Sequence, residues 1–254
     1  MKRKHHKALQ GEFPESWRKL LGEKLRWWSM LGDGDRRRME ALIKVFLADK
    51  SFEGTRGFEP SEEMKVQIAA QACLLILGLD YEFYDDVTSV IVSPTIVHHK
   101  GPRHLDGGIV SDDHAALSGQ AMLHGPVLIA WDRLSDQALH PDRGHNVVFH
   151  EFAHKLDMRN GSGNGVPPMS AELKQRWEPA LRSILQRLRR GSSASLDGYG
   201  GTNPAELLAV ATEAFFDVPV RLQRDEPDLF GLLKAFYRQD PAARLTASSG
   251  GTPA

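Results

Sequence analysis

The chain has 254 residues, of which 41% are hydrophobic and 26% are charged, and its formal net charge is −1. These values predict one large domain or two small ones with a buried core, and the near-neutral charge gives no electrostatic argument for nucleic-acid binding. Cys73 is the only cysteine, which excludes an internal disulfide and a zinc site built from cysteines.

No stretch of the sequence has the pattern of a membrane segment or a secretion signal. The apolar runs stay below the roughly 18 residues of a transmembrane helix, and the basic residues 1–7 are not followed by an apolar segment. We therefore expect no membrane partner and a cytoplasmic location. We also expect a single domain over residues 12–245, with disordered tails at residues 1–11 and 246–254.

Hydrophobic periodicity predicts many helices and a few short strands. Helices are expected over residues 13–31, 35–48, 60–78, 171–190, 204–217 and 226–238. Strands are expected over residues 88–92, 107–110 and 126–131. One more helix is expected between Asp142, which would be its N-cap, and Asn160 with the following glycine, where it would end. This order predicts an α+β fold in which helices predominate.

That last helix carries an H-E-x-x-H motif, because residues 150–154 read His-Glu-Phe-Ala-His. On a helix, His150 and His154 lie about 40° apart around the axis and about 6 Å apart along it, so both imidazoles can reach one ion. Zinc binds imidazole nitrogens and keeps one position open for water in catalytic sites, where Glu151 would be the general base. The alternative interpretation is a buried helix with two incidental histidines.

A catalytic zinc site needs a third protein ligand, and no third histidine follows the motif at short range. The acidic candidates are Glu206 and Glu213, which lie about 20° apart and about 10.5 Å apart along one helix, so they do not readily share an ion. Asn203 and Glu206 also form a capping-box pattern, so Glu206 has two interpretations, as part of a helix cap or as a metal ligand. Glu213 also has two interpretations, as a metal ligand or as the hydrogen-bond partner of a ligating histidine.

Two further features have two interpretations each. Asp157, three residues after His154, would either orient a ligand imidazole or be exposed to solvent in the last turn of its helix. The strand at residues 126–131 would either align an extended peptide by backbone pairing or be an ordinary core strand.

Outside the motif, residues 68–75, 125–131, 155–161, 204–206 and Tyr199 match a known pattern. Together with residues 150–154, they resemble the Mlc titration factor A family of zinc peptidases over roughly residues 12–245. These gluzincin-type enzymes are similar in active-site layout to the anthrax lethal factor peptidase domain. The resemblance implies a zincin-like metallopeptidase domain with a small mixed sheet beside the motif helix.

The resemblance also implies a role for each matching site residue, with Zn²⁺ as the cofactor. The implied ligands are His150, His154 and Glu206, the implied general base is Glu151, and Tyr199 corresponds to a tyrosine that stabilises the oxyanion. This chain departs from the family in one place. Some members have a histidine soon after the Gly-Ile-Val segment that approaches the metal, whereas here Ser111 follows and the nearest histidine is His114.

The functional expectation is a zinc-dependent, aminopeptidase-like enzyme that hydrolyses peptide substrates with a zinc-activated water. The resemblance further implies binding to a transcriptional repressor of sugar-uptake genes, without direct contact to nucleic acid. The alternative is a non-catalytic protein that sequesters such a regulator, with zinc structural or vestigial. A closed structural zinc site would need a fourth ligand, for which His114 is the candidate.

Overall fold

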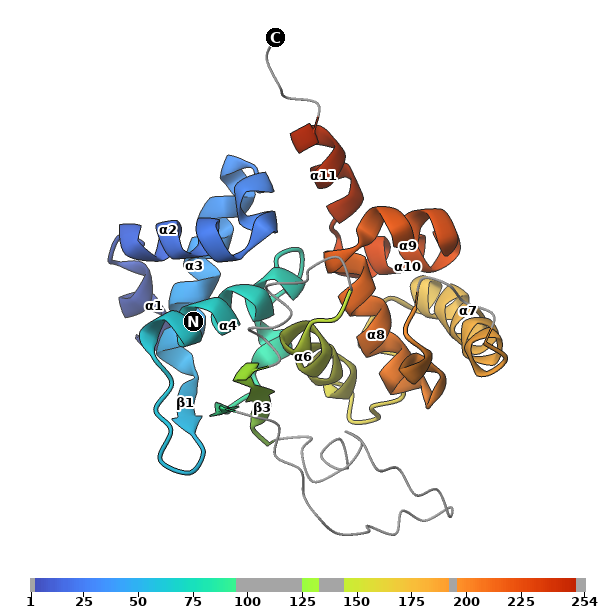
Figure 1. Cartoon of the computed structure of the whole chain (residues 1–254), viewed down its shortest axis with the longest axis horizontal. Helices are drawn as coiled ribbons and strands as arrows, with labels where there is room; N and C mark the ends of the chain where they lie inside the picture. The colour runs from blue at the N-terminus through green and yellow to red at the C-terminus, as the bar shows by residue number, and fades with distance from the viewer. Residues whose placement is uncertain (1–2, 95–124, 133–143, 192–195, 250–254) are drawn as a thin grey trace.

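The computed structural model describes residues 3–94, 125–132, 144–191 and 196–249. The N-terminal helices and a small sheet lie on one side of the molecule, and the C-terminal helices lie on the other (Figure 1). The helix that carries the H-E-x-x-H motif, α6 (Val147–Met158), lies between the two groups.

The N-terminal group contains α1 (Arg3–Leu9), α2 (Glu15–Lys24), the 3-10 helix η1 (Arg26–Met30), α3 (Asp33–Asp49), β1 (Ser51–Gly54), α4 (Glu62–Leu75), η2 (Tyr81–Tyr84), β2 (Ser89–Ser93) and β3 (Val127–Ala130). The C-terminal group contains α7 (Ala171–Arg189), η5 (Gly198–Gly201), α8 (Pro204–Asp217), α9 (Pro219–Asp225), α10 (Pro227–Tyr237) and α11 (Pro241–Ser249). Seven of these predicted elements are confirmed, with their ends shifted by a few residues: the helices at 35–48, 60–78, 171–190, 204–217 and 226–238, and the strands at 88–92 and 126–131.

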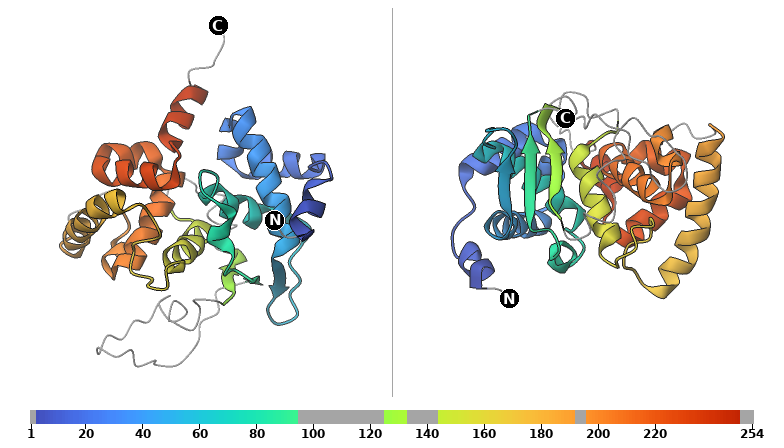
Figure 2. Two further views of the ribbon diagram at one scale, coloured as in Figure 1. Left: turned by 180° about the vertical axis from the view of Figure 1, so that it is seen from behind. Right: turned by 90° about the horizontal axis from the view of Figure 1, so that it is seen from below.

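The sheet lies beside α6, and its described strands are all parallel, in the order β1-β2-β3 (Figure 2, right). Val90 of β2 is in register with Phe52 of β1 and with Val127 of β3. The sequence predicts a mixed sheet, but no antiparallel pair occurs among these strands, and the expected strand at residues 107–110 lies outside the described residues. Strand β1 was not predicted, because its sequence, Ser-Phe-Glu-Gly, contains only one apolar residue. Most of its residues are exposed.

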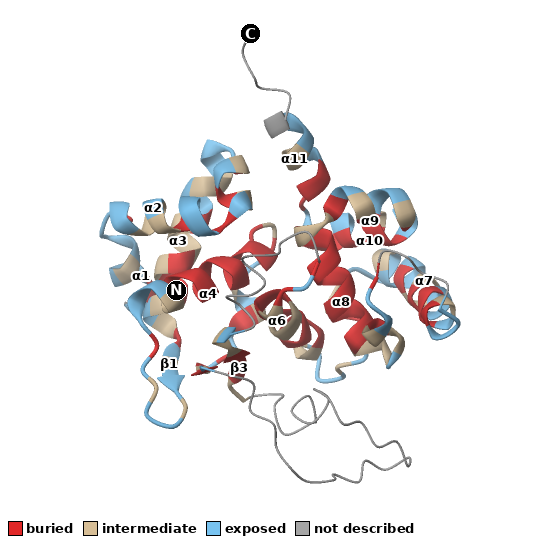
Figure 3. Cartoon of the chain, in the orientation of Figure 1, coloured by how far each residue is buried: buried red, intermediate tan, exposed pale blue. Residues whose placement is uncertain are grey.

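The core follows the three helices α4, α6 and α8, which Figure 3 shows as the most continuously buried segments. In α4 every residue from Val66 to Leu75 is buried, as expected for a helix that is apolar around most of its circumference. In α6 the rings of Phe149 and Phe152 are fully buried. Burial on this side of α6 fixes the direction in which the motif histidines point.

Helix α6 begins at a cap other than the predicted one. The side-chain Oδ1 of Asn146 accepts hydrogen bonds from the backbone N–H groups of Val148 and Phe149, both at 3.1 Å. Asparagine is among the best N-cap residues because its side chain satisfies N–H groups that have no partner within the helix. The prediction of Asp142 as the N-cap is therefore wrong, and Asp142 itself lies outside the described residues.

The ends of the chain are more ordered than the sequence predicts. Residues 3–9, expected within a disordered tail, form α1, and the ring of His5 is buried with its Nε2 3.2 Å from Asp49 Oδ1 of α3. The last helix, α11, continues to Ser249. The helix predicted over residues 13–31 is divided into α2 and η1 by Leu25, whose backbone is extended. Within the described ranges, no helix has the length and apolar character needed to cross a membrane.

Candidate metal centre

The two motif histidines lie on one face of α6 with their rings close together. The Nε2 atoms of His150 and His154 are 3.2 Å apart, and the ring centroids are separated by 4.9 Å. His154 is buried and His150 is half-buried. The predicted i, i+4 arrangement is therefore present, with both imidazoles directed at the same point.

Helix α8 brings Glu206 to that point. Asn203 caps this helix by accepting a hydrogen bond from the backbone N–H of Glu206 at 3.0 Å, and Pro204 occupies the first helical position. The Glu206 carboxylate instead faces the histidines, with Oε2 3.1 Å from His150 Nε2 and 3.4 Å from His154 Nε2. The cap and the ligand interpretations of this segment are thus compatible, because the backbone of Glu206 serves one and its side chain the other.

These three side chains form a group whose ligand atoms all lie within 4.8 Å of one another. Glu206 Oε2 is buried and makes no hydrogen bond of good geometry, although two imidazole nitrogens approach it. In its neutral form, each imidazole that donates from Nδ1 presents a lone pair at Nε2. Three electron-pair donors would then converge with no proton between them, which is the donor set of a cation site. Two imidazoles and one carboxylate fit the ligand set of a catalytic zinc.

Glu213 contacts the opposite ring nitrogen of His150 from the one that faces Glu206, and so it holds this imidazole in place. Its Oε1 lies 2.7 Å from His150 Nδ1, and its Oε2 accepts a hydrogen bond from the backbone N–H of Asn146 at 2.5 Å. Glu213 therefore belongs outside the three-residue group, and its geometry matches the hydrogen-bond partner of a ligating imidazole. Asn146 is the residue that the sequence analysis missed, although its N-cap preference was a usable signal.

The carboxylates control the charge of the cluster when no metal is bound. Burial lowers the pKa of His150, but Glu206 and Glu213 raise it more, to about 10. Burial raises the pKa of Glu206, but His150 and His154 lower it more, to about 2. At neutral pH, the metal-free protein therefore carries a protonated His150 against an ionised Glu206. A metal ion would have to displace that proton, because only deprotonated imidazole is a ligand.

The two expected catalytic residues lie near the cluster. Glu151 is half-buried on α6, and its charge raises the pKa of His150. Tyr199 is half-buried in η5, and its ring centroid is 6.2 Å from that of His150. Asp197 fixes this turn by accepting a hydrogen bond from the backbone N–H of Tyr199 at 2.7 Å. The structure thus brings Tyr199 beside the histidines from a distant part of the sequence.

Asp157 has a structural role that differs from both interpretations of the sequence. It is fully buried, so the prediction of a solvent-exposed aspartate is wrong. Its Oδ2 accepts a hydrogen bond from the backbone N–H of Gly165 at 2.7 Å, and in the described chain no hydrogen bond joins it to a motif imidazole. Burial raises the pKa of Asp157. Asp157 therefore connects the end of α6 to the loop that follows it.

The remaining histidines add no ligand among the described residues. His145 is exposed, and its Nε2 is 3.5 Å from Asp197 Oδ2. The candidate fourth ligand, His114, lies outside the described residues. His98, His99, His104, His124 and His140 also lie outside the described residues.

Comparison with known proteins shows which family this chain belongs to. A protein-family model described as glucose-regulated metallo-peptidase M90 matches residues 1–238. An uncharacterized protein of Synechocystis sp. is 34% identical over 239 residues, which cover 92% of this chain and 87% of the relative. Mlc titration factor A of Salmonella typhi is 34% identical over 222 residues, which cover 85% of this chain and 83% of the relative.

The same protein of Cronobacter sakazakii is 32% identical over 222 residues. The mainly helical α+β architecture, with a small sheet beside α6, agrees with a zincin-like metallopeptidase domain. The chain therefore belongs to the glucose-regulated metallo-peptidase M90 family. It is also similar in sequence to proteins named Mlc titration factor A.

Proposed function

We propose that this chain is a zinc-dependent peptidase whose metal ligands are His150, His154 and Glu206. The supporting observation is the convergence of two Nε2 atoms and one carboxylate oxygen within 4.8 Å, with Glu213 fixing the orientation of His150. When bound, zinc would supply a Lewis acid for the peptide carbonyl and would lower the pKa of a water molecule. The family supports a metallopeptidase, and the ligand set favours zinc among divalent metals.

In this proposal Glu151 moves the proton. Its position in the motif, directly after the first ligand, suits a general base that takes a proton from the attacking water and delivers it to the leaving amine. Tyr199 donates a hydrogen bond to the oxyanion that develops on the substrate carbonyl. The supporting observation for Tyr199 is that its ring lies 6.2 Å from that of His150, on a turn that Asp197 holds.

Strand β3 is the proposed guide for the peptide substrate. It pairs with β2 along one edge and packs against α6, which brings an extended chain laid along it close to the motif. Lys155 ties the two elements together, because its Nζ donates a hydrogen bond to the carbonyl oxygen of Gly125 at 2.9 Å. Val127 and Ile129 are buried, so the same strand also contributes to the core. We further propose an aminopeptidase-like preference, for which free and N-blocked peptides are the test.

The substitution Glu151→Gln tests the mechanism. Zinc content, measured by elemental analysis, should stay at the parental value, while chelator-sensitive cleavage of chromogenic peptides should fall by about 10²- to 10⁴-fold. Glu172, an exposed residue of α7, provides the matched control Glu172→Gln, which should change neither quantity. Unchanged cleavage by the Glu151→Gln protein would disprove the proposed role of this residue.

A second candidate function comes from the relatives that are named Mlc titration factor A. We propose that this chain also binds a transcriptional repressor of sugar-uptake genes. Protein that contains zinc and binds such a repressor but cleaves no peptide would favour a purely sequestering role. The cytoplasmic location stays a prediction that cell fractionation would test.

A further inference from the structure

One buried asparagine, Asn146, contacts the helices α4, α6 and α8 at the same time. Its side-chain Oδ1 caps α6, and its side-chain Nδ2 donates a hydrogen bond to Gln71 Oε1 of α4 at 2.8 Å. Its backbone N–H donates to Glu213 Oε2 of α8, and its side chain also hydrogen-bonds Asp217, one turn further along α8. Asn146 therefore connects the helix of the H-E-x-x-H motif to both of its neighbours.

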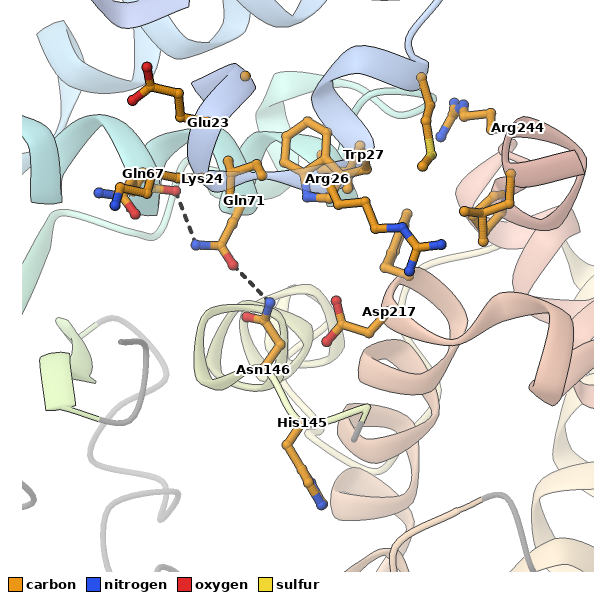
Figure 4. Close-up of a pocket in the computed structure, with 17 residues that line it drawn as sticks. Glu23, Lys24, Arg26, Trp27, Gln67, Gln71, His145, Asn146, Asp217 and Arg244 are labelled. Atoms are coloured by element: carbon orange, nitrogen blue, oxygen red, sulfur yellow. Dashed lines mark hydrogen bonds between the residues drawn. The ribbon is translucent and has the colours of Figure 1, made fainter. Parts of the chain in front are cut away.

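Gln71 is the residue of α4 that meets this asparagine. It lies in the stretch from Val66 to Leu75, where every residue is buried, and it is itself only 3% exposed. Its Nε2 donates to the backbone carbonyl of Gln67 at 3.3 Å, and its Oε1 accepts from Asn146, as the dashed lines in Figure 4 show. Burial of an amide costs free energy unless it is hydrogen-bonded, so these two bonds hold Gln71 in one orientation.

The hydrogen bonds of the Asn146 side chain have a fixed direction. Its Oδ1 accepts from the N–H groups of Val148 and Phe149, so its Nδ2 is the atom that remains to donate toward α4. That donor needs an acceptor, which Gln71 Oε1 supplies. An apolar side chain at position 71 would remove this acceptor, and such a loss costs free energy in a buried site. The cap of α6 thus determines which partner α4 has to provide.

The network reaches the metal centre through Glu213. One carboxylate oxygen of Glu213 accepts from the Asn146 backbone, and the other lies 2.7 Å from His150 Nδ1. A carboxylate only accepts, so the proton of this second bond belongs to Nδ1. His150 Nε2 is then the atom that faces Glu206, at 3.1 Å. The orientation of the His150 ring therefore depends on Glu213, and the position of Glu213 depends on Asn146.

We propose that Gln71 and Asn146 are positioning residues of the metal centre, which hold Glu213 in place and through it the imidazole of His150. Three hydrogen bonds in series carry this effect from Gln71 to Asn146, from Asn146 to Glu213 and from Glu213 to His150. The effect on metal binding rests on the proposed zinc site. The effect on the His150 ring does not, because all three bonds are present without a metal.

Gln239 provides a matched control for Gln71. It is 5% exposed, its Nε2 donates to the carbonyl oxygen of Leu74 in α4 at 2.7 Å, and its Oε1 accepts from Arg244 at 3.0 Å. Gln71 and Gln239 are thus equally buried amides with two hydrogen bonds each, but within the described residues those of Gln239 do not lead to Glu213. Gln239→Leu should lower the free energy of unfolding as Gln71→Leu does, without an effect on His150.

The Nδ1 proton of His150 allows a test without metal. In the metal-free, full-length protein labelled with ¹⁵N, we expect a resolved imidazole signal that exchanges slowly with water, because Glu213 holds this proton. Gln71→Leu and Asn146→Ser should each raise the exchange rate by about fivefold or more, whereas Gln239→Leu should leave it unchanged. Serine is itself a good N-cap, so Asn146→Ser keeps α6 capped while it removes the donor to Gln71.

Three results of this exchange measurement would overturn the proposal. The first is an unchanged exchange rate in both Gln71→Leu and Asn146→Ser. The second is an equal increase in Gln239→Leu, which would assign the effect to a general loss of stability. The third is a parental protein without a slowly exchanging Nδ1 proton on His150, because Glu213 would then not hold the ring.

Zinc affinity, measured by competition with a chelator, tests the effect on the metal centre. Hydrogen-bond partners of a ligating histidine contribute about 10- to 100-fold to metal affinity. We expect a loss of about tenfold for Asn146→Ser and, at one step further away, about fivefold for Gln71→Leu. In a protein that already carries Glu213→Gln, Gln71→Leu should cause less than about a twofold further loss, because its effect passes through Glu213. Fully additive losses would contradict this route.

The two measurements separate this inference from the proposed peptidase function. A parental protein that binds zinc but cleaves no peptide would contradict the peptidase, while the affinities of the variants would still decide the role of Gln71 and Asn146. A parental protein that binds no zinc would refute the zinc site. The exchange of the His150 proton would still decide whether the network positions that ring, because it is measured on metal-free protein.

Discussion

Two buried polar clusters within the described ranges place a histidine beside a carboxylate, and they differ in the groups that compensate the carboxylate charge. In the cluster that joins α1 to α3, Asp49 faces the Lys50 ammonium at 2.8 Å, the His5 ring at 3.2 Å and the Tyr81 hydroxyl at 3.3 Å. In the candidate metal centre, Glu206 faces two imidazole nitrogens and no ammonium or guanidinium group within the described residues.

The difference lies in how the charges are compensated. Lys50 also donates to the carbonyl oxygen of Tyr84 at 2.6 Å, so in the first cluster a buried ammonium group of the protein itself compensates the Asp49 carboxylate. In the candidate metal centre, the Glu206 carboxylate and the Nε2 lone pairs of the two neutral imidazoles all face one another. A proton or a cation is needed between them. Burial of polar groups therefore does not identify a functional site by itself, and what distinguishes the candidate metal centre is that three side chains with ligand atoms converge on one point.

Glu206→Gln should give the largest effect and tests whether the imbalance creates the metal site. Zinc affinity should fall by more than about 100-fold, above the range for residues that only hydrogen-bond a ligand, and hydrolysis should be lost. Chelator competition measures the first quantity. If the Glu206→Gln protein kept the parental zinc affinity, the Glu206 carboxylate would not be a metal ligand, and the proposed difference between the two clusters would be wrong.

Lys50→Met should destabilise the fold without touching zinc. It leaves the Asp49 carboxylate without its ammonium partner, which we expect to cost about 3 kcal/mol in the free energy of unfolding, measured with denaturant. Lys174→Met breaks an exposed pair with Glu178 on α7 and should cost less than about 1 kcal/mol. A change in zinc stoichiometry after Lys50→Met would show that the two clusters are not separate in function.

Tyr199→Phe should lower kcat by about 100-fold, because it removes one proposed hydrogen-bond donor to the oxyanion. Zinc content and the unfolding free energy should stay at parental values, since the aromatic ring remains. Steady-state kinetics with a chromogenic peptide measure the effect. A loss confined to KM would assign Tyr199 to substrate binding instead.

Glu213→Gln should have a smaller effect on the metal centre. The amide retains an oxygen near His150 Nδ1 but lacks the charge, so zinc affinity should fall by about tenfold. Glu213→Ala should give the larger loss of this pair. Equal and parental affinities in both proteins would show that the hydrogen bond at 2.7 Å does not position the ligand.

The pH dependence of the metal-free protein tests the charge state of His150 in the candidate metal centre. The pKa of His150 rises from about 6.5 in the unfolded chain to about 10 in the fold, so its stabilising contribution is complete below pH 6.5. That contribution disappears as the pH rises through 10. Thermal unfolding with EDTA at pH 7 and pH 10 should show this loss, which Glu206→Gln should reduce. A pH-independent midpoint in the parental protein would contradict the protonated state of His150.

The sequence was informative for several local contacts. The four-residue spacing of His150 and His154 determines that they share a helix face, and the cap of α8 follows from Asn203, whereas the cap of α6 is Asn146 and not the predicted Asp142. Prediction was weaker where tertiary contacts decide. The short exposed strand β1 is defined by pairing with β2, and α1 is held by the contact of His5 with Asp49.

By itself, the sequence determined the H-E-x-x-H helix, the shared face of its two histidines and the mainly helical class of the fold. Local sequence left both Glu206 and Glu213 open as the third member of the group and the family resemblance implied Glu206, whereas the tertiary structure shows which of the two lies beside both Nε2 atoms. The docking of α8 against α6 places the first against both Nε2 atoms and the second against His150 Nδ1. A metal centre of this kind depends on the relative position of two helices, which no local pattern encodes.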